Sequence, residues 1–324
     1  MKHSISGRVL WLSCAAAAAL TAAALRRWQR RSAVEEYTGL AIPGAQASVI
    51  LTCVLAIVGA WFVILSLAGR PLSARWDQVF LSVGSPVYPV LEISAAFFAI
   101  AAAPVLFIVG VEQFQIYQEM KAAHLQNSAI QVPTDNGLLT LATAGGAFLA
   151  ALGLVQSGRD GLRPGRRGRG GFSAALPGVA GCVWLMESFR SHAANPVRWD
   201  YAPQVLAIVL GMAFYMDFAG MSAGLARPRR LLWMAGMTVV FSAVALMTTA
   251  SELSGRAAAG QSLCCAQLGD LLLLLSQALA AAGVLWQLPS SLDRPSLSSL
   301  FRPRDRAEPR PESNQEIQED TDDE

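Results

Sequence analysis

The sequence predicts an all-α protein, a polytopic transmembrane helical bundle of about eight spans, and two observations carry this prediction. Hydrophobic residues make up 53% of the 324 residues, charged residues only 15%, and the mean hydropathy is +0.41. This balance is too apolar for an ordinary soluble domain. The apolar residues also gather into blocks of about 17 to 26, roughly the length that a helix needs to cross a hydrocarbon core of about 30 Å. Lipid is therefore the expected solvent of this chain.

Eight apolar blocks qualify as spans and place residues 1–288 in one transmembrane domain. The blocks cover residues 9–25, 48–69, 88–111, 137–156, 172–189, 202–225, 231–250 and 263–288. The first and fifth are the weakest because they have only 17 and 18 residues. The first is also rich in alanine, whose apolarity is modest, so it is the span expected to fail if the true count is seven. A basic start before an apolar run also resembles a signal peptide, but no cleavage site precedes a polar domain, so an uncleaved span is expected.

The segment after the last span has a different composition. Residues 289–324 are rich in Pro, Ser and Arg and end in an acidic run, which is too polar to bury a core. We expect a disordered cytoplasmic tail through which the protein could recruit protein partners.

The basic residues predict the orientation of the spans. One side of the predicted membrane carries 17 Lys and Arg, in the N-terminal stretch, residues 70–75, 159–169 and 227–230, and the tail, whereas the other side carries eight. Because cytoplasmic loops hold the excess of Lys and Arg, both termini are expected in the cytoplasm. Four arginines within residues 26–31 lie on the wrong side for this rule. They add to the doubt about the first span.

Cofactors, metals and nucleic acid are not expected. The cysteines all fall in apolar blocks without a C-x-x-C pair, and no two histidines lie in spans where they could ligate a haem. The arginine- and glycine-rich loop at residues 157–171 resembles an RNA-binding tract, but five arginines in a short link are what cytoplasmic orientation requires.

Ionisable residues inside spans are the candidate functional residues, because burying them in lipid is costly. Asp217 is expected to be the deepest, roughly 20 Å along the sixth span from its outer end, with a role in proton coupling or as a hydrogen-bonded link between helices. Glu92 lies near the inner end of the third span, and Asp270 lies on the outer side. Glu187 and Arg190 are three residues apart on one helix, which favours a local ion pair.

Two catalytic patterns occur only as fragments. Tyr215 with Asp217, and Gly269 with Asp270, resemble the signatures of intramembrane aspartyl proteases, but one signature has an inserted residue and the other lacks its first glycine. Residues 220–224 match both the G-x-S-x-G nucleophile elbow and the G-x-x-x-G helix-packing pattern. Since no span holds a histidine, packing is the expected role. The sequence thus predicts no enzyme.

Prolines and a weak internal similarity favour transport slightly. Pro86, Pro89, Pro104, Pro177 and Pro203 lie in or beside spans, where they can break helices that line a pathway. Residues 46–76 align without gaps to residues 203–233, sharing an R-P-x4-W pattern. This similarity suggests a duplication of four spans, as in some transporters.

The stretch of residues 181–233, with CVWLMESFRSHAANPVRWDYAPQVLAIVLGMAFYMDFAG at its centre, resembles a segment of a family of uncharacterised bacterial multi-pass membrane proteins. The resemblance covers about a sixth of the chain. It implies a location in the bacterial inner membrane and supplies no activity or site residue.

Two functions follow from these observations. The absence of a catalytic motif and the tail favour a non-enzymatic membrane scaffold or accessory subunit. The alternative is a small-solute or ion permease that uses Asp217 in a pathway between helices. The sequence names no substrate.

Overall fold

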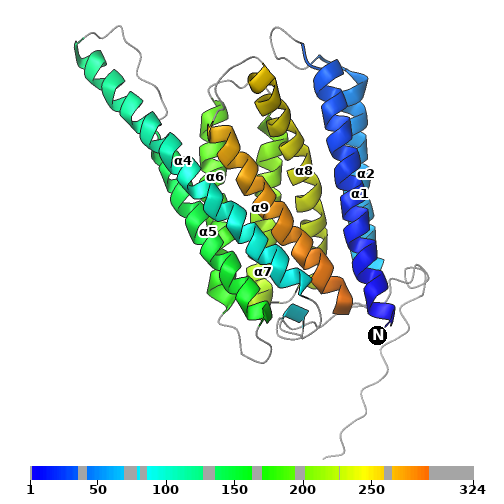
Figure 1. The fold of residues 1–324 in the computed structure, drawn as a ribbon. Helices are drawn as coiled ribbons and strands as arrows, with labels where there is room; N and C mark the ends of the chain where they lie inside the picture. The colour runs from blue at the N-terminus through cyan, green and yellow to red at the C-terminus, as the bar shows by residue number, and fades with distance from the viewer. Residues whose placement is uncertain are drawn as a thin grey trace, which may run out of the picture.

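The computed structural model describes residues 2–35, 42–68, 79–80, 86–126, 136–162, 170–193, 201–225, 227–258 and 265–291. These residues form eight long α-helices and a final 3-10 turn (Figure 1). In chain order they are α1 (Lys2–Ser32), α2 (Gln46–Ala68), α4 (Val87–Gln126), α5 (Leu138–Leu162), α6 (Gly170–Ala193), α7 (Ala202–Ser222), α8 (Pro228–Ala258), α9 (Cys265–Gln287) and η2 (Leu288–Ser291). The predicted all-α bundle is confirmed. The tail predicted for residues 289–324 lies almost entirely outside the described residues.

Seven of these helices are long and apolar enough to cross a membrane, and α6 is the exception. Of the two spans predicted to be weakest, the fifth, now α6, is the one that does not qualify, so the expectation that the first would fail is wrong: the apolar part of α1, Val9–Ser32, qualifies. Ser173, Glu187 and Arg190 reduce the apolarity of α6. It nevertheless packs lengthwise between α5 and α7.

Two helices continue well past the predicted spans. The third span is predicted to end at Val111, but α4 continues to Gln126, and α8 continues beyond Ala250 to Ala258. A helix satisfies its own backbone hydrogen bonds in water as well as in lipid, so apolarity marks where a span ends and not where a helix ends. Figure 1 shows the end of α4 projecting beyond the neighbouring helices.

Six helices close into a ring in chain order. Each of α4 to α9 packs against the next, and α9 packs back against α4. Such antiparallel neighbours are the outcome of short connections between helices. We call α4 to α9 the six-helix ring. The hairpin of α1 and α2 lies outside it, against α8 (Figure 1).

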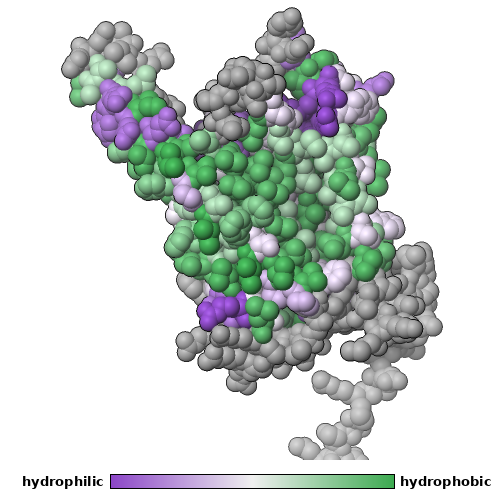
Figure 2. Space-filling model, viewed as in Figure 1, coloured by the Kyte–Doolittle hydropathy of each residue, from purple (hydrophilic) through white to green (hydrophobic). Residues whose placement is uncertain are grey.

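The two ends of the six-helix ring are distinguished by the helix ends that lie there. The terminal face is the end at which α1 begins and α9 finishes, and the distal face is the other end (Figure 1). Hydrophobic residues cover the middle of the molecule, and hydrophilic residues gather toward both ends (Figure 2). This distribution suits a multi-pass membrane protein.

Small residues let the ring helices approach closely. The buried face of α5 consists mainly of Ala, Gly, Ser and Thr. A side chain at Gly153 would strike the Ser173 carbonyl of α6, and one at Gly146 would come within 3.4 Å of Ala180. Close backbone approach is the usual way in which helices associate in lipid, where the hydrophobic effect does not drive them together.

The duplication suggested by residues 46–76 and 203–233 gains no support from the packing. In such a duplication α2 would correspond to α7, and α4 to α8. However, α7 packs along α8, whereas α2 packs mainly against α1 and α8 rather than against α4. The shared R-P-x4-W pattern lies partly in residues 69–78, outside the described residues.

Candidate functional site

A cavity of about 40 Å³ lies among the helices of the six-helix ring. Five of its helices contribute to the lining; only α8 does not. The lining residues are Ala99, Thr143, Ala147, Ala150, Leu154, Pro177, Ala180, Gly181, Trp184, Met212, Tyr215, Leu273, Ser276 and Gln277. This volume is room for about three water molecules.

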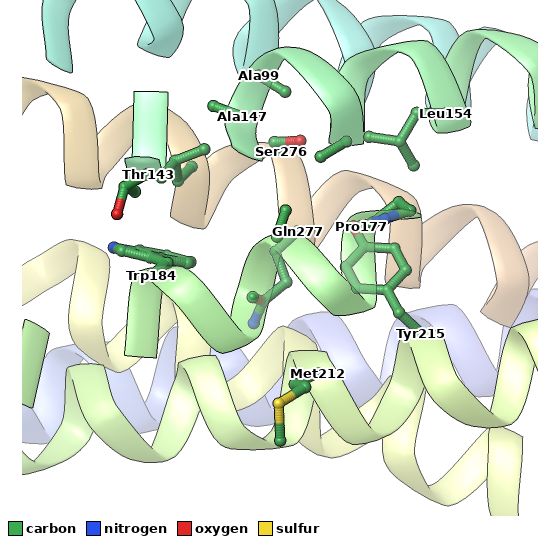
Figure 3. A pocket seen from close by; sticks show the side chains of 14 residues that line it. Ala99, Thr143, Ala147, Leu154, Pro177, Trp184, Met212, Tyr215, Ser276 and Gln277 are labelled. Atoms are coloured by element: carbon green, nitrogen blue, oxygen red, sulfur yellow. The ribbon is translucent and has the colours of Figure 1, made fainter. Parts of the chain in front are cut away.

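Polar groups are spread along the length of the cavity. Figure 3 shows Thr143 and Trp184 toward one end, Pro177 and Tyr215 toward the other, and Gln277 between them. Small residues line much of the remaining wall, so the polar groups are not covered by bulky side chains. A pocket with apolar walls and a few convergent polar groups is typical of a binding site.

Gln277 joins three helices at the centre of the ring. Its Nε2 donates to the Ala207 carbonyl of α7 at 2.7 Å and to Ser242 Oγ of α8 at 3.3 Å. A side chain at Gly211 would collide with the Gln277 amide. Gly211 therefore leaves the space that this buried amide occupies.

Asp270 lies beside the distal end of the cavity. Its Oδ1 accepts a hydrogen bond of 2.8 Å from Trp184 Nε1. Asp270 precedes Ser276 by six residues, or about 9 Å of helix. The hydrogen bond holds the indole of Trp184 against the cavity, so the predicted candidate Asp270 is connected to the site through Trp184.

Glu92 lies on the terminal side of the cavity. Its side chain is 1% exposed, and its Oε2 has no hydrogen-bond partner. A side chain at Gly158 of α5 would come within 3.3 Å of Glu92 Cβ, and one at Gly283 of α9 within 3.8 Å of Oε1. Glu92 is thus packed between α5 and α9, where glycines make room for it.

The distance from Glu92 to the cavity can be followed on three helices. On α4, the cavity residue Ala99 lies seven residues from Glu92. On α5, Leu154 lies four residues from Gly158, and on α9, Ser276 lies seven residues from Gly283, the two glycines beside Glu92. This offset corresponds to about 6 to 10 Å along the ring. Tyr215, at one end of the cavity (Figure 3), is the polar lining residue on the side of Glu92.

An aromatic group lies on the terminal side of Glu92. The Tyr88 ring, one helical turn before Glu92, lies 5.0 Å from Phe80, and Phe80 lies 5.4 Å from Phe218. The Tyr88 hydroxyl shares a hydrogen bond of 2.8 Å with Ser157 Oγ. These buried rings separate Glu92 from the terminal face.

Asp217 is placed differently from the prediction. It lies five residues before the end of α7, and its Oδ2 is 2.8 Å from Nε of Arg230 at the start of α8. The side chain of Arg230 is 49% exposed, so the pair lies at the edge of the terminal face. Asp217 is not among the residues that line the cavity. The prediction that it is the deepest ionisable residue is wrong, because Asp217, Glu92 and Asp270 each lie five residues from an end of their helices.

The other predicted candidates lie away from the cavity. Glu187 is half-buried and Arg190 is exposed, near the distal end of α6. Neither lines the cavity, and their mutual ion pair stays a prediction. Asp217 and Asp270 lie toward opposite faces of the ring, as expected from their positions on the parallel helices α7 and α9, which gives the protease fragments no common centre.

The G-x-x-x-G pattern at residues 220–224 serves another purpose than helix packing. Gly224 has a φ of +87° just after α7, Leu225 N donates to the Gly220 carbonyl, and Gly224 N donates to that of Met221. These two bonds form a Schellman motif, in which glycine ends a helix. A side chain at Gly220 would meet nothing closer than 3.9 Å.

Sequence reasoning missed most of the cavity. Of the prolines, Pro177 lines it and Pro104 is exposed on the outside of the ring. Thr143 and Trp184 carry no recognisable pattern, and Tyr215 drew notice only through the protease-like fragment with Asp217. Ser276 and Gln277 stand together in a run of leucines and alanines, and this interruption is the signal that could have found them.

Comparisons with known proteins add no relative to this description. No protein-family model, curated protein or solved structure matches the chain.

Proposed function

We propose that this protein is a small-solute or ion permease whose pathway runs through the six-helix ring. The observation that carries the proposal is the cavity with polar groups along its length, lined by α4, α5, α6, α7 and α9. Binding sites in helical membrane proteins are built between helices, from a few polar groups in an apolar frame. A protein that only holds neighbours together has no need of an internal cavity with convergent polar groups.

Two features favour a pathway over a closed pocket. Trp184, hydrogen-bonded to Asp270, lies at the distal end of the cavity, and Tyr215 lies at the other end, on the side of Glu92. Polar groups therefore follow one another along the ring. Pro177, within α6, removes a backbone donor beside the cavity and provides a place at which this helix can bend.

This proposal replaces the intramembrane residue expected from the sequence. Asp217 is paired with Arg230 away from the cavity, whereas Glu92 is buried in the ring about 6 to 10 Å from the cavity, without a partner for Oε2. Uncompensated ionisable groups in a membrane interior are the ones that mark ion and substrate paths. The permease that we propose therefore uses Glu92 rather than Asp217.

Cysteine labelling tests the pathway. In a variant without native cysteines, Thr143→Cys and Ser276→Cys should react with a charged methanethiosulfonate reagent, because thiols ionise and react where water reaches them. Phe148→Cys on α5, 52% exposed on the outside of the ring, is the matched control and should stay unlabelled in lipid. Failure of both cavity positions to react, in right-side-out and in inverted vesicles, would refute the pathway.

A membrane scaffold or accessory subunit is the second candidate function. It is favoured by residues 112–126 of α4, which project past the ring and leave Ile116, Met120 and Leu125 exposed. An exposed helix surface with apolar residues is suited to a partner helix. A cavity closed to labelling from both sides would make this the preferred function.

We further propose that the chain lies in a bacterial inner membrane with both termini in the cytoplasm. The terminal face would then carry the 17 Lys and Arg of the basic side, as the positive-inside rule requires. Arg26 and Arg30, on the other side, are engaged with Thr248 and Glu252 and so count little against this orientation.

Reporter fusions test the orientation. A reporter fused after Glu324 and one inserted at residues 163–169 should both report the cytoplasm, whereas one inserted at residues 127–135 should report the periplasm. A periplasmic signal from either of the first two would reverse the orientation or change the number of spans.

A further inference from the structure

We propose that Glu92 is a reversible proton-binding site at the terminal end of the cavity, and that the proton is an ion which this pathway handles. The inference rests on the proposed permease function and names the ion for it. Three properties of the Glu92 carboxyl group support it: its burial, its neighbours and its position.

The surroundings of Glu92 offer its carboxylate little compensation. The side chain is 1% exposed, and within the described part of the chain Oε2 meets no hydrogen-bond donor. An isolated carboxylate in an apolar interior is far costlier than a neutral carboxyl group. The surroundings of Glu92 in this structure therefore favour the protonated form of its carboxyl group.

The groups that face Glu92 give a metal ion poor ligands. On α4 the neighbour is Tyr88, whose hydroxyl is bonded to Ser157 of α5, and α9 presents Gly283. Other titratable groups on this side of the ring are the buried Tyr215 of α7 and Asp160 near the end of α5. Cations such as Na⁺ or Ca²⁺ need several oxygen ligands, and no three His, Cys, Asp or Glu gather as a metal site among the residues described. A proton needs only one oxygen.

The position of Glu92 gives its proton two directions of release. The cavity lies about 6 to 10 Å from Glu92 on its distal side, and the packed rings of Phe80 and Tyr88 lie on its terminal side. Water that enters from the cavity, or through a displacement of these rings, would stabilise the carboxylate and let the proton leave. Glu92 would thus exchange its proton with one face at a time.

Infrared spectroscopy of the full-length protein in lipid tests this inference. The wild type should show the carboxylic C=O band of a buried acid, and this band should disappear and return reversibly as the pH is cycled between about 4 and 10. Glu92→Gln should lack the band. Asp217→Asn, which removes a carboxyl group that is paired with Arg230, should keep it.

A carbodiimide provides a second measurement on the unaltered chain, so the test does not depend on the folding of Glu92→Gln. These hydrophobic reagents modify protonated carboxyl groups in apolar surroundings. Peptide mapping after treatment with dicyclohexylcarbodiimide should find the adduct on Glu92 and not on the exposed Glu119 of the same helix, and labelling should fall as the pH rises.

The outcomes separate the two proposals. A band that does not change with pH, or the absence of an adduct on Glu92, would overturn the proton site even if the cavity cysteines are labelled and the permease stands. If Glu92 titrates while the cavity cysteines stay unlabelled, the proton site stands and the proposed pathway fails.

Discussion

Replacing Gly211 by alanine is expected to lower the free energy of unfolding by about 2 kcal/mol, as overpacking of a close interior does. The added methyl group would occupy the space of the Gln277 amide. The amide would have to turn away from the Ala207 carbonyl and Ser242, which leaves buried polar groups without partners. The change is measured by SDS titration of the purified protein in detergent micelles.

A double variant isolates the cause of this loss. Truncating Gln277 to alanine removes the atoms that the methyl group strikes, so Gly211→Ala should cost much less in a Gln277→Ala background than alone. Gly220→Ala on the same helix is the matched control and should be nearly neutral, because its methyl group would meet nothing closer than 3.9 Å. Equal effects of Gly211→Ala in both backgrounds would contradict the proposed collision.

Reversing the charge of Arg30 is expected to loosen the attachment of α1. Its guanidinium lies 2.8 Å from Glu252 Oε1, and the two side chains are 22% and 32% exposed. Arg30→Glu should cost about 2 kcal/mol, between the values typical of exposed and buried pairs. The measurements are SDS titration and limited proteolysis of the α1–α2 hairpin.

The charge swap and a neighbouring arginine serve as controls. Arg30→Glu combined with Glu252→Arg should recover most of the loss, because the opposite charges meet again. Arg31→Glu makes the same charge change at an exposed position and should have little effect. If Arg31→Glu were as damaging as Arg30→Glu, the cause would be the net charge at this end of α1 and not the ion pair.

The contacts of Arg26 and Arg30 explain why the basic cluster at residues 26–31 lies on the side that the positive-inside rule does not favour. Arg26 is 5% exposed and donates to Thr248 Oγ1 at 3.0 Å, while Glu252 also accepts from Gln267 of α9 at 2.8 Å. These arginines bind α1 to the ring and act less as an orientation signal. Their partners lie more than 200 residues away in the sequence, so no local pattern could reveal them.

The sequence by itself determined the class of this protein. The apolar blocks are long enough to span a membrane, and lipid leaves helices as the way to satisfy the backbone of each block. Fold class and approximate helix positions follow from this local requirement. The continuation of α4 to Gln126 does not, because apolarity says nothing about a helix in water.

Only the tertiary structure decided which polar residues matter. In the sequence, Asp217 and Glu92 look alike, because each is a single acidic residue in an apolar segment. In the structure, Asp217 has the guanidinium of Arg230 beside it. Glu92 has two glycines beside it and no partner for Oε2. The cavity likewise depends on the closure of α9 against α4. The free energy of a buried charge is set by what surrounds it in space, and in this chain those surroundings come from distant helices.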